Sequence, residues 1–160
     1  MLSAVIPVLN EEKTLNTVLD NLSKIPLLNT AYFVLNGCTD KSAEIIQRAK
    51  TPYQKSIITY PAALGFDIPR AVGAYYALKH TAKGILFLDG DISEDIHVCL
   101  NKLAHEVCLK QTDLALTNCY PYPTKRFARA EEVLAARGEL NRALGLFHDL
   151  GLASPSHGPS

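Results

Sequence analysis

The sequence predicts an α/β fold with a mostly parallel central sheet flanked by helices. Short apolar segments begin at residues 2, 31, 56, 84 and 113, and each is followed by a segment with helical spacing of apolar residues. The starts lie 29, 25, 28 and 29 residues apart, and the segments share no repeated motif. This regularity is typical of successive βα units, which build a parallel sheet through right-handed crossovers.

Composition indicates one folded domain. The chain has 160 residues, of which 48% are hydrophobic and 20% are charged, so it can bury a substantial core and is not globally disordered. We expect a single domain over residues 1–150 and a different character for residues 151–160, which are rich in Gly, Pro and Ser.

The first two units have clear boundaries. Residues 2–9 are a short apolar run that predicts a buried strand, and Asn10 is placed to cap a helix that opens with Glu11 and Glu12. Residues 31–35 predict the second strand. The turn after it is followed by Thr39 or Asp40 as the cap of a second helix.

The later units follow the same scheme. Residues 56–60, 84–88 and 113–119 predict the third, fourth and fifth strands, and Ser93 is placed to cap the helix after the fourth. Residues 126–144 predict a last, Ala-rich helix. Four apolar residues mark the third helix, and these are Ile68, Val72, Tyr75 and Tyr76.

Charge and cysteine content exclude some classes of protein. Sixteen basic residues balance sixteen acidic ones, whereas a nucleic-acid binder normally has a basic excess. No apolar run reaches the length of a membrane span, and the N-terminus lacks the features of a secretory signal, so we expect a cytoplasmic protein. The four cysteines form no metal-binding spacing and are interpreted as reduced, structural thiols.

Polar residues follow each of the first four predicted strands. In a parallel sheet the carboxyl ends of the strands meet at one edge, where ligands bind. The candidate binding residues at this edge are Asn10 and Glu11 after the first strand, Asn36 and Asp40 after the second, Gly65 and Arg70 after the third, and Asp89 and Asp91 after the fourth.

Asp89 and Asp91 are the sharpest of these signals. In an extended backbone, residues two apart point the same way, roughly 6.6 Å along the chain, and Gly90 between them leaves space for a ligand. Two carboxylates so placed can share a hard divalent cation, Mn²⁺ or Mg²⁺, which can neutralise a diphosphate. We interpret the nearby Glu94 and Asp95 as acidic residues that open the next helix.

Four segments resemble, in order, the motifs of the nucleotide-binding half of the family 2 glycosyltransferases, which have the GT-A fold. The segments are AVIPVLNEE at residues 4–12, VLNGCTDKS at 34–42, GFDIPRAVG at 65–73 and ILFLDGD at 85–91. Together they span most of residues 2–91.

The resemblance implies an enzyme that moves a sugar from a UDP- or GDP-linked donor to an unidentified acceptor with the help of Mn²⁺ or Mg²⁺. It implies that Asp89 and Asp91 bind the metal. It further implies donor contacts from Pro7, Asn10, Glu11, Asn36, Asp40, Gly65, Arg70 and Asp89.

The chain departs from the family pattern at three positions. Leu35 and Asn36 stand where the family usually has two aspartates, and Ala71 stands where it usually has Asn. A carboxylate that would accept a hydrogen bond from the donor base is therefore missing. Because an amide both donates and accepts, base recognition with an altered preference remains open.

No motif beyond residue 91 marks a catalytic base. The carboxylates of Asp149, Glu131 and Glu132 lack a matching context, and His157 is interpreted as a tail residue rather than a metal ligand. Three basic residues follow the fifth predicted strand, and they either lie at the solvated start of a helix or bind a phosphate group of the acceptor. These residues are Lys125, Arg126 and Arg129. Residues 151–160 are either a flexible tail or the start of a missing acceptor-binding half.

Two other functions stay open. The chain is alternatively a non-catalytic fragment that keeps the nucleotide-sugar pocket and lacks the acceptor half. A phosphatase of the haloacid dehalogenase type would use Asp89 as nucleophile and Asp91 as acid. That class places its DxD motif near the chain start and needs a later acidic pair, and this chain offers neither.

Overall fold

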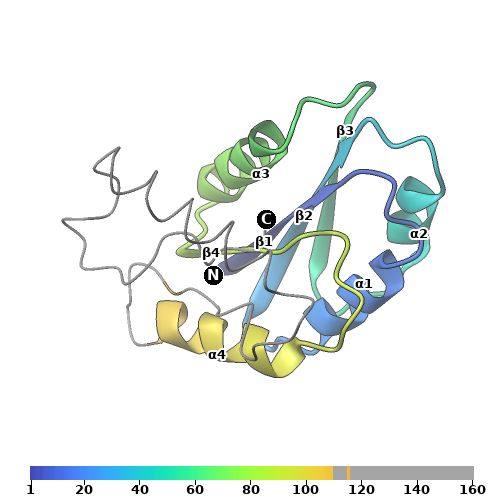
Figure 1. Cartoon of the computed structure of the whole chain (residues 1–160). Coiled ribbons are helices and arrows are strands. Elements are labelled where there is room, and N and C mark those ends of the chain that lie inside the picture. Colours follow the sequence, from blue (N-terminus) through green and yellow to red (C-terminus); the bar gives the residue numbers. More distant parts are fainter. Residues whose placement is uncertain (110–114, 116–160) are drawn as a thin grey trace, which may run out of the picture. The chain divides into compact units, whose positions relative to one another are not determined.

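The computed structural model describes residues 1–109 and residue 115, and these residues have the predicted α/β architecture. Strands and helices alternate along the chain (Figure 1). In chain order the elements are β1 (Leu2–Val8), α1 (Leu15–Ser23), β2 (Leu28–Asn36), α2 (Ser42–Arg48), β3 (Gln54–Tyr60), α3 (Asp67–Lys79), β4 (Gly84–Phe87) and α4 (His97–Cys108).

The four strands form one parallel sheet in the order β3-β2-β1-β4. β1 lies in the interior of the sheet, where Val5 is in register with Tyr32 of β2 and with Phe87 of β4. Strands covered on both faces need apolar side chains on both faces. This requirement explains why the segments that form β1 and β2 are nearly continuous apolar runs.

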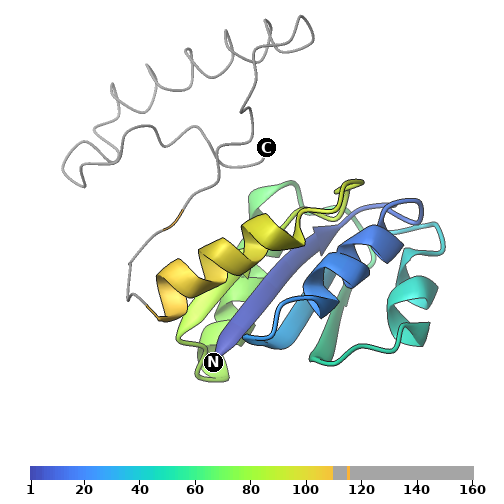
Figure 2. The same ribbon diagram turned by 90° about the horizontal axis from the view of Figure 1, so that it is seen from below.

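Helices cover both faces of the sheet. The main core joins one face to α1, α2 and α4, with Ile6 and Phe33 from the strands, Leu15 and Ile46 from the first two helices, and Leu100 from α4. A smaller cluster on the other face joins Val5 and Tyr32 to Ala77 of α3. Figure 2 shows α3 on the opposite side of the sheet from the other helices.

Two predicted helix caps are wrong. α1 begins at Leu15 rather than directly after Asn10, because Asn10 has a left-handed backbone with φ of 58° and its side chain bonds elsewhere. α4 begins at His97, so Ser93 does not cap it. A side-chain oxygen of Asp95 instead accepts a 3.4 Å hydrogen bond from the backbone N–H of His97.

The third helix is present but presents an unexpected face to the sheet. Its buried residues are Pro69, Gly73 and Ala77, whereas Ile68 and Tyr75 are 50% and 60% exposed. A Cβ atom at Gly73 would collide with a side-chain methyl of Val5. The helix therefore packs on the sheet through its small residues.

Several predictions concern residues outside the described part of the chain. The fifth predicted strand lies almost wholly outside this part, and the last helix and residues 151–160 lie outside it entirely, so a single domain over 1–150 stays a prediction. Within the described part of the chain no helix is long and apolar enough to cross a membrane. Three of the four cysteines are described there, and all three are free thiols: Cys38, Cys99 and Cys108.

Candidate functional site

The loops after β1 and β2 are joined by reciprocal side-chain-to-backbone hydrogen bonds. The side-chain oxygen of Asn10 accepts from the backbone N–H groups of Thr39 (2.8 Å) and Asp40 (3.3 Å). In return, a carboxylate oxygen of Asp40 accepts from the backbone N–H of Glu12 at 3.0 Å. Asn10 and Asp40, both predicted as donor contacts, thus hold two strand ends together.

Asp40 also organises the start of α2. Its second oxygen accepts from the backbone N–H of Ser42 at 2.9 Å, and the Ser42 hydroxyl oxygen accepts from the backbone N–H of Glu11 at 2.9 Å. Burial raises the pKa of the Asp40 carboxyl, but its hydrogen bonds from Ser42 and Glu12 outweigh burial, so the net shift is downward. Asp40 is therefore held in its charged form.

Thr14 ties the first loop to the acidic motif after β4. Its hydroxyl donates to the carbonyl oxygen of Gly90 at 2.8 Å, and that hydroxyl also lies 3.3 Å from a carboxylate oxygen of Glu11. A Cβ atom at Gly90 would lie 2.9 Å from the carbonyl oxygen of Pro7 and 3.2 Å from Cγ of Glu11. Gly90 is therefore required where the β4 loop passes against the end of β1.

Arg70 and Asp89 form an ion pair across the edge of the sheet. The distance between Nη2 of Arg70, on α3, and Oδ1 of Asp89 is 2.5 Å, and their side chains are 28% and 15% exposed. A half-buried pair of this kind is a charge-assisted hydrogen bond with a fixed geometry. Arg70 therefore orients the Asp89 carboxylate, whereas Asp91 is exposed to solvent.

Asn36 holds the loop that leads to α3. Its side-chain oxygen accepts from the backbone N–H of Leu64 at 2.7 Å, and its amide nitrogen donates to the carbonyl oxygen of Gly65 at 3.0 Å. Only 5% of Asn36 is exposed. Gly65 has a φ of 85°, a backbone conformation that favours glycine. Both predicted donor residues therefore shape this loop.

Glu11 feels the negative charges of acidic residues from the neighbouring loops. Burial raises the pKa of Glu11 above its ordinary value, and the negative charges of Asp91, Asp40 and Asp89 raise it further, against the lowering effect of the hydrogen bond from Thr14. The structure thus brings these four carboxylates to one edge, as the parallel topology predicts.

The chemistry of this cluster fits a hard divalent cation that binds together with a phosphate-bearing ligand. Among residues 1–109 and 115, no three His, Cys, Asp or Glu side chains form a ready-made metal cage. Mg²⁺ is commonly held by one or two carboxylates while substrate phosphates and water complete its coordination. Asp89 and Asp91 provide such carboxylates, and the pKa of the neighbouring Glu11 is raised first by burial and then by the negative charges of Asp91, Asp40 and Asp89.

Sequence reasoning missed two residues that position the cluster. Thr14 directly precedes α1 and Ser42 begins α2, and both link the loops through the hydrogen bonds above. A single Thr or Ser at a helix start carries no signal that separates this role from ordinary capping. Other predicted residues lie outside the described part of the chain, and they are Lys125, Arg126, Arg129, Glu131, Glu132, Asp149 and His157.

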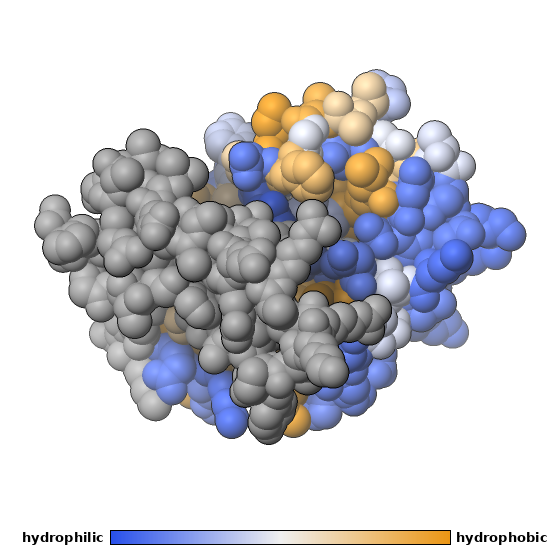
Figure 3. Space-filling model, in the orientation of Figure 1, coloured by the Kyte–Doolittle hydropathy of each residue, from blue (hydrophilic) through white to orange (hydrophobic). Residues whose placement is uncertain are grey.

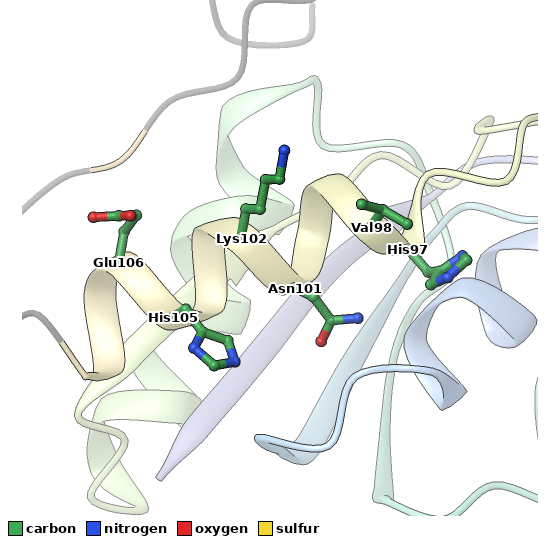
Figure 4. A pocket seen from close by; sticks show the side chains of 6 residues that line it. All are labelled: His97, Val98, Asn101, Lys102, His105 and Glu106. Carbon is green, nitrogen blue, oxygen red and sulfur yellow. The ribbon is translucent and has the colours of Figure 1, made fainter.

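A separate hollow of about 650 Å³ lies along α4 and contains none of the predicted residues. Its lining is His97, Val98, Asn101, Lys102, His105 and Glu106. Figure 4 shows that these side chains leave a single helix on different sides. The described residues thus supply only one wall, and no converging set of groups points to a ligand.

Comparison with known structures agrees with this fold. The chain resembles S. aureus TarS 1-349 in complex with UDP at 20% identity and a TM-score of 0.57, over 79% of this chain and 39% of that one. It also resembles the UDP-GlcNAc complex of TarS 1-349, with 20% identity and a TM-score of 0.59 over 79% of this chain and 38% of that one. The chain therefore spans about two fifths of the length of these structures.

Comparison of the sequence with curated proteins and with models of protein families bears on the family of the chain. No curated protein matches the chain. The model of "Glycosyl transferase family 2" matches residues 3–154, which is nearly the whole sequence. This match supports the resemblance carried by the four motifs and gives no support to a phosphatase. The chain belongs to glycosyl transferase family 2.

Proposed function

We propose that the carboxyl edge of the sheet binds a nucleotide-diphosphate sugar together with Mn²⁺ or Mg²⁺, and that the chain is the donor-binding part of a glycosyltransferase. The observation that carries this proposal is the gathering of Glu11, Asp40, Asp89 and Asp91 at one edge, beside Arg70. The TarS structures with UDP and UDP-GlcNAc support the choice of donor class.

In this proposal Asp89 and Asp91 hold the cation, which supplies neutralisation of the charge on the departing nucleoside diphosphate. Arg70 fixes the orientation of the Asp89 carboxylate through their ion pair. Asn10 and Asp40 keep the loops after β1 and β2 at a constant separation, so that the nucleoside meets a rigid surface. Asn36 and Gly65 set the path of the loop before α3.

Base recognition in this proposal does not depend on a carboxylate at the end of β2. Leu35 is buried, and both ends of the Asn36 amide already bond the backbone of the β3–α3 loop. We therefore keep UDP and GDP as equal candidates for the donor nucleotide. Binding of each is measured in the experiment below.

The test is calorimetric titration of the full chain with UDP and with GDP, with and without Mn²⁺. We expect Mn²⁺ to strengthen binding of one nucleotide by about tenfold or more, equivalent to about 1.4 kcal/mol. Asp91→Asn should remove this increment, because one of the two proposed ligands loses its charge. Glu94→Gln is the matched control, since it removes one exposed negative charge nearby and should leave the increment unchanged.

Two outcomes would contradict the proposal. One is binding that is the same with and without Mn²⁺ in the unchanged chain. The other is an Asp91→Asn variant that keeps the full effect of Mn²⁺. Hydrolysis by the full chain of a sugar donor that carries whichever nucleotide binds then separates an active transferase from a binding fragment, because only the former turns over its donor.

A further inference from the structure

The outer face of α3 carries an apolar stripe that nothing in residues 1–109 covers. Ile68, Ala71, Tyr75 and Leu78 follow one another at spacings of three, four and three residues, which places them on one side of the helix. The three large members are 50%, 60% and 62% exposed, in that order. We call these four residues the α3 stripe.

Further apolar surface is exposed at the start of α3. Phe66, which directly precedes α3, is 83% exposed. Figure 3 shows apolar atoms gathered at the top of the view, over the start of α3 and the loop before it. The Tyr75 ring packs edge-on against Tyr76, with ring centroids 5.5 Å apart.

The α3 stripe is complementary to itself. Ile68 and Leu78 are equally far from Gly73 along the helix, and so are Ala71 and Tyr75. Two copies of α3 related by a two-fold axis and running antiparallel would therefore place Ile68 level with Leu78 of the other copy. In the same arrangement each Tyr75 would lie level with an Ala71, so a large residue meets a small one in both central layers.

The charges at the ends of α3 favour the same arrangement. Asp67 lies in the first turn and Lys79 in the last. In an antiparallel pair the acidic end of each helix lies beside the basic end of the other, and the two helix dipoles are opposed. Parallel pairing would instead bring like charges together at both ends.

We infer that two copies of this chain associate through the α3 stripe in an antiparallel, two-fold arrangement. One pair of 13-residue helices buries on the order of 1,000 Å² in total, below the roughly 1,200–2,000 Å² of stable specific interfaces. Interfaces below this range are mostly those of weak, transient complexes, so we expect a dissociation constant of about 10 μM or higher. The inference is independent of the proposed function, because it uses the helix face that points away from the sheet.

The test is sedimentation equilibrium of the full chain from about 5 to 500 μM, a range that brackets the expected dissociation constant. Tyr75→Ala leaves an alanine opposite an alanine in both central layers of the interface, and Ala71→Tyr places a tyrosine opposite a tyrosine. Either change should weaken the dimer at least about tenfold. The double variant Ala71→Tyr with Tyr75→Ala exchanges large and small residues and should recover most of the association. Both positions are exposed, so circular dichroism should show an unchanged fold.

Val98→Ala is the matched control, because Val98 is 59% exposed on α4 and lies off the stripe. It should leave the dimer unchanged. The inference is overturned if the unchanged chain stays monomeric up to the highest concentration, a result that would mean the stripe is covered by other residues of the chain or left bare. It is also overturned if the double variant associates no better than the two single ones, or if Val98→Ala weakens association as much as they do.

Discussion

The polar residues of the candidate site are mainly bonded to backbone groups of neighbouring loops. The Asn36 amide is an instance, since it bonds Leu64 and Gly65 and is almost fully buried. A carboxylate at this position would accept from Leu64 but would face the carbonyl oxygen of Gly65 with a second acceptor. The amide therefore suits the loop in a way that the family's usual aspartate does not.

Replacing Asn36 tests this structural role. Asn36→Ala leaves the N–H of Leu64 and the carbonyl of Gly65 without their partner, and such a loss costs about 1–3 kcal/mol when the groups stay buried. We expect a lower urea midpoint with an unchanged slope. Asn16→Ala, at an exposed position of α1, is the control and should change stability by less than about 0.5 kcal/mol. Equal stability of the two variants would mean that the Asn36 bonds contribute nothing net.

At the scale of elements, the order of strands and helices could be predicted from the sequence, because apolar runs and helical spacing repeat along the chain. Helix starts could not. Asn is a residue type that often caps helices, so Asn10 is a reasonable cap from the sequence. Its left-handed backbone and its hydrogen bonds to the loop after β2 depend on contacts between segments about 30 residues apart. Similarly, a motif predicts Arg70 as a site residue, whereas its ion pair with Asp89 depends on the position of α3 relative to the loop after β4.

The orientation of α3 shows why the spacing of apolar residues predicts the helix but not the side that faces the sheet. The prediction used Ile68 and Tyr75 as marks of a helix, which is correct, but these large residues point outward. The sheet-facing side is instead formed by Pro69, Gly73 and Ala77, and at Gly73 the helix passes so close to Val5 of β1 that no larger side chain fits there. A stripe of small residues has little weight in a hydrophobic pattern, so it could not be recognised beforehand.

This close approach of α3 to the sheet predicts a specific coupling between two residues. Gly73→Ala forces its new methyl group onto Val5, and such overpacking costs about 1–3 kcal/mol despite the better helix propensity of Ala. In a Val5→Ala background the same change should cost less, because both colliding methyl groups are gone and only the Cβ atom of residue 5, 3.2 Å from the new methyl group, still crowds it. Urea unfolding of the four members of this cycle measures the coupling. Equal costs of Gly73→Ala in both backgrounds would contradict close packing at this point.

At the scale of the whole molecule, the acidic edge of the sheet links stability to pH. The chain has no net formal charge, yet Glu11, Asp40, Asp89 and Asp91 gather at one edge. Folding therefore concentrates negative charge that is dispersed in the unfolded chain. Folding shifts the pKa values of Glu11 and Asp40 in opposite directions. Burial and like charges raise the pKa of Glu11, whereas hydrogen bonds lower the pKa of Asp40.

The two pKa shifts predict opposite effects of pH on the free energy of unfolding. A raised pKa means that folded Glu11 holds its proton more tightly than unfolded Glu11, so its ionisation reduces stability as pH rises above the ordinary value of 4.5. The lowered pKa of Asp40 gives stability that is present above its ordinary value of 3.8 and is lost as pH falls through the folded pKa. Between about pH 3 and about pH 7, Glu11→Gln should therefore gain stability relative to the unchanged chain, whereas Asp40→Asn should lose it.

Urea unfolding at a series of pH values measures both profiles, and adding Mn²⁺ connects them to the proposed site. A cation held near Asp89 and Asp91 offsets the charges that raise the pKa of Glu11, so the advantage of Glu11→Gln at neutral pH should shrink when Mn²⁺ and UDP are present together. The Asp40→Asn profile should keep its direction, because the Asp40 shift comes from hydrogen bonds to Ser42 and Glu12 rather than from the acidic neighbours. If Glu11→Gln tracks the unchanged chain at every pH, the carboxylates do not repel one another enough to require a cation, and the electrostatic case for a metal at this edge fails.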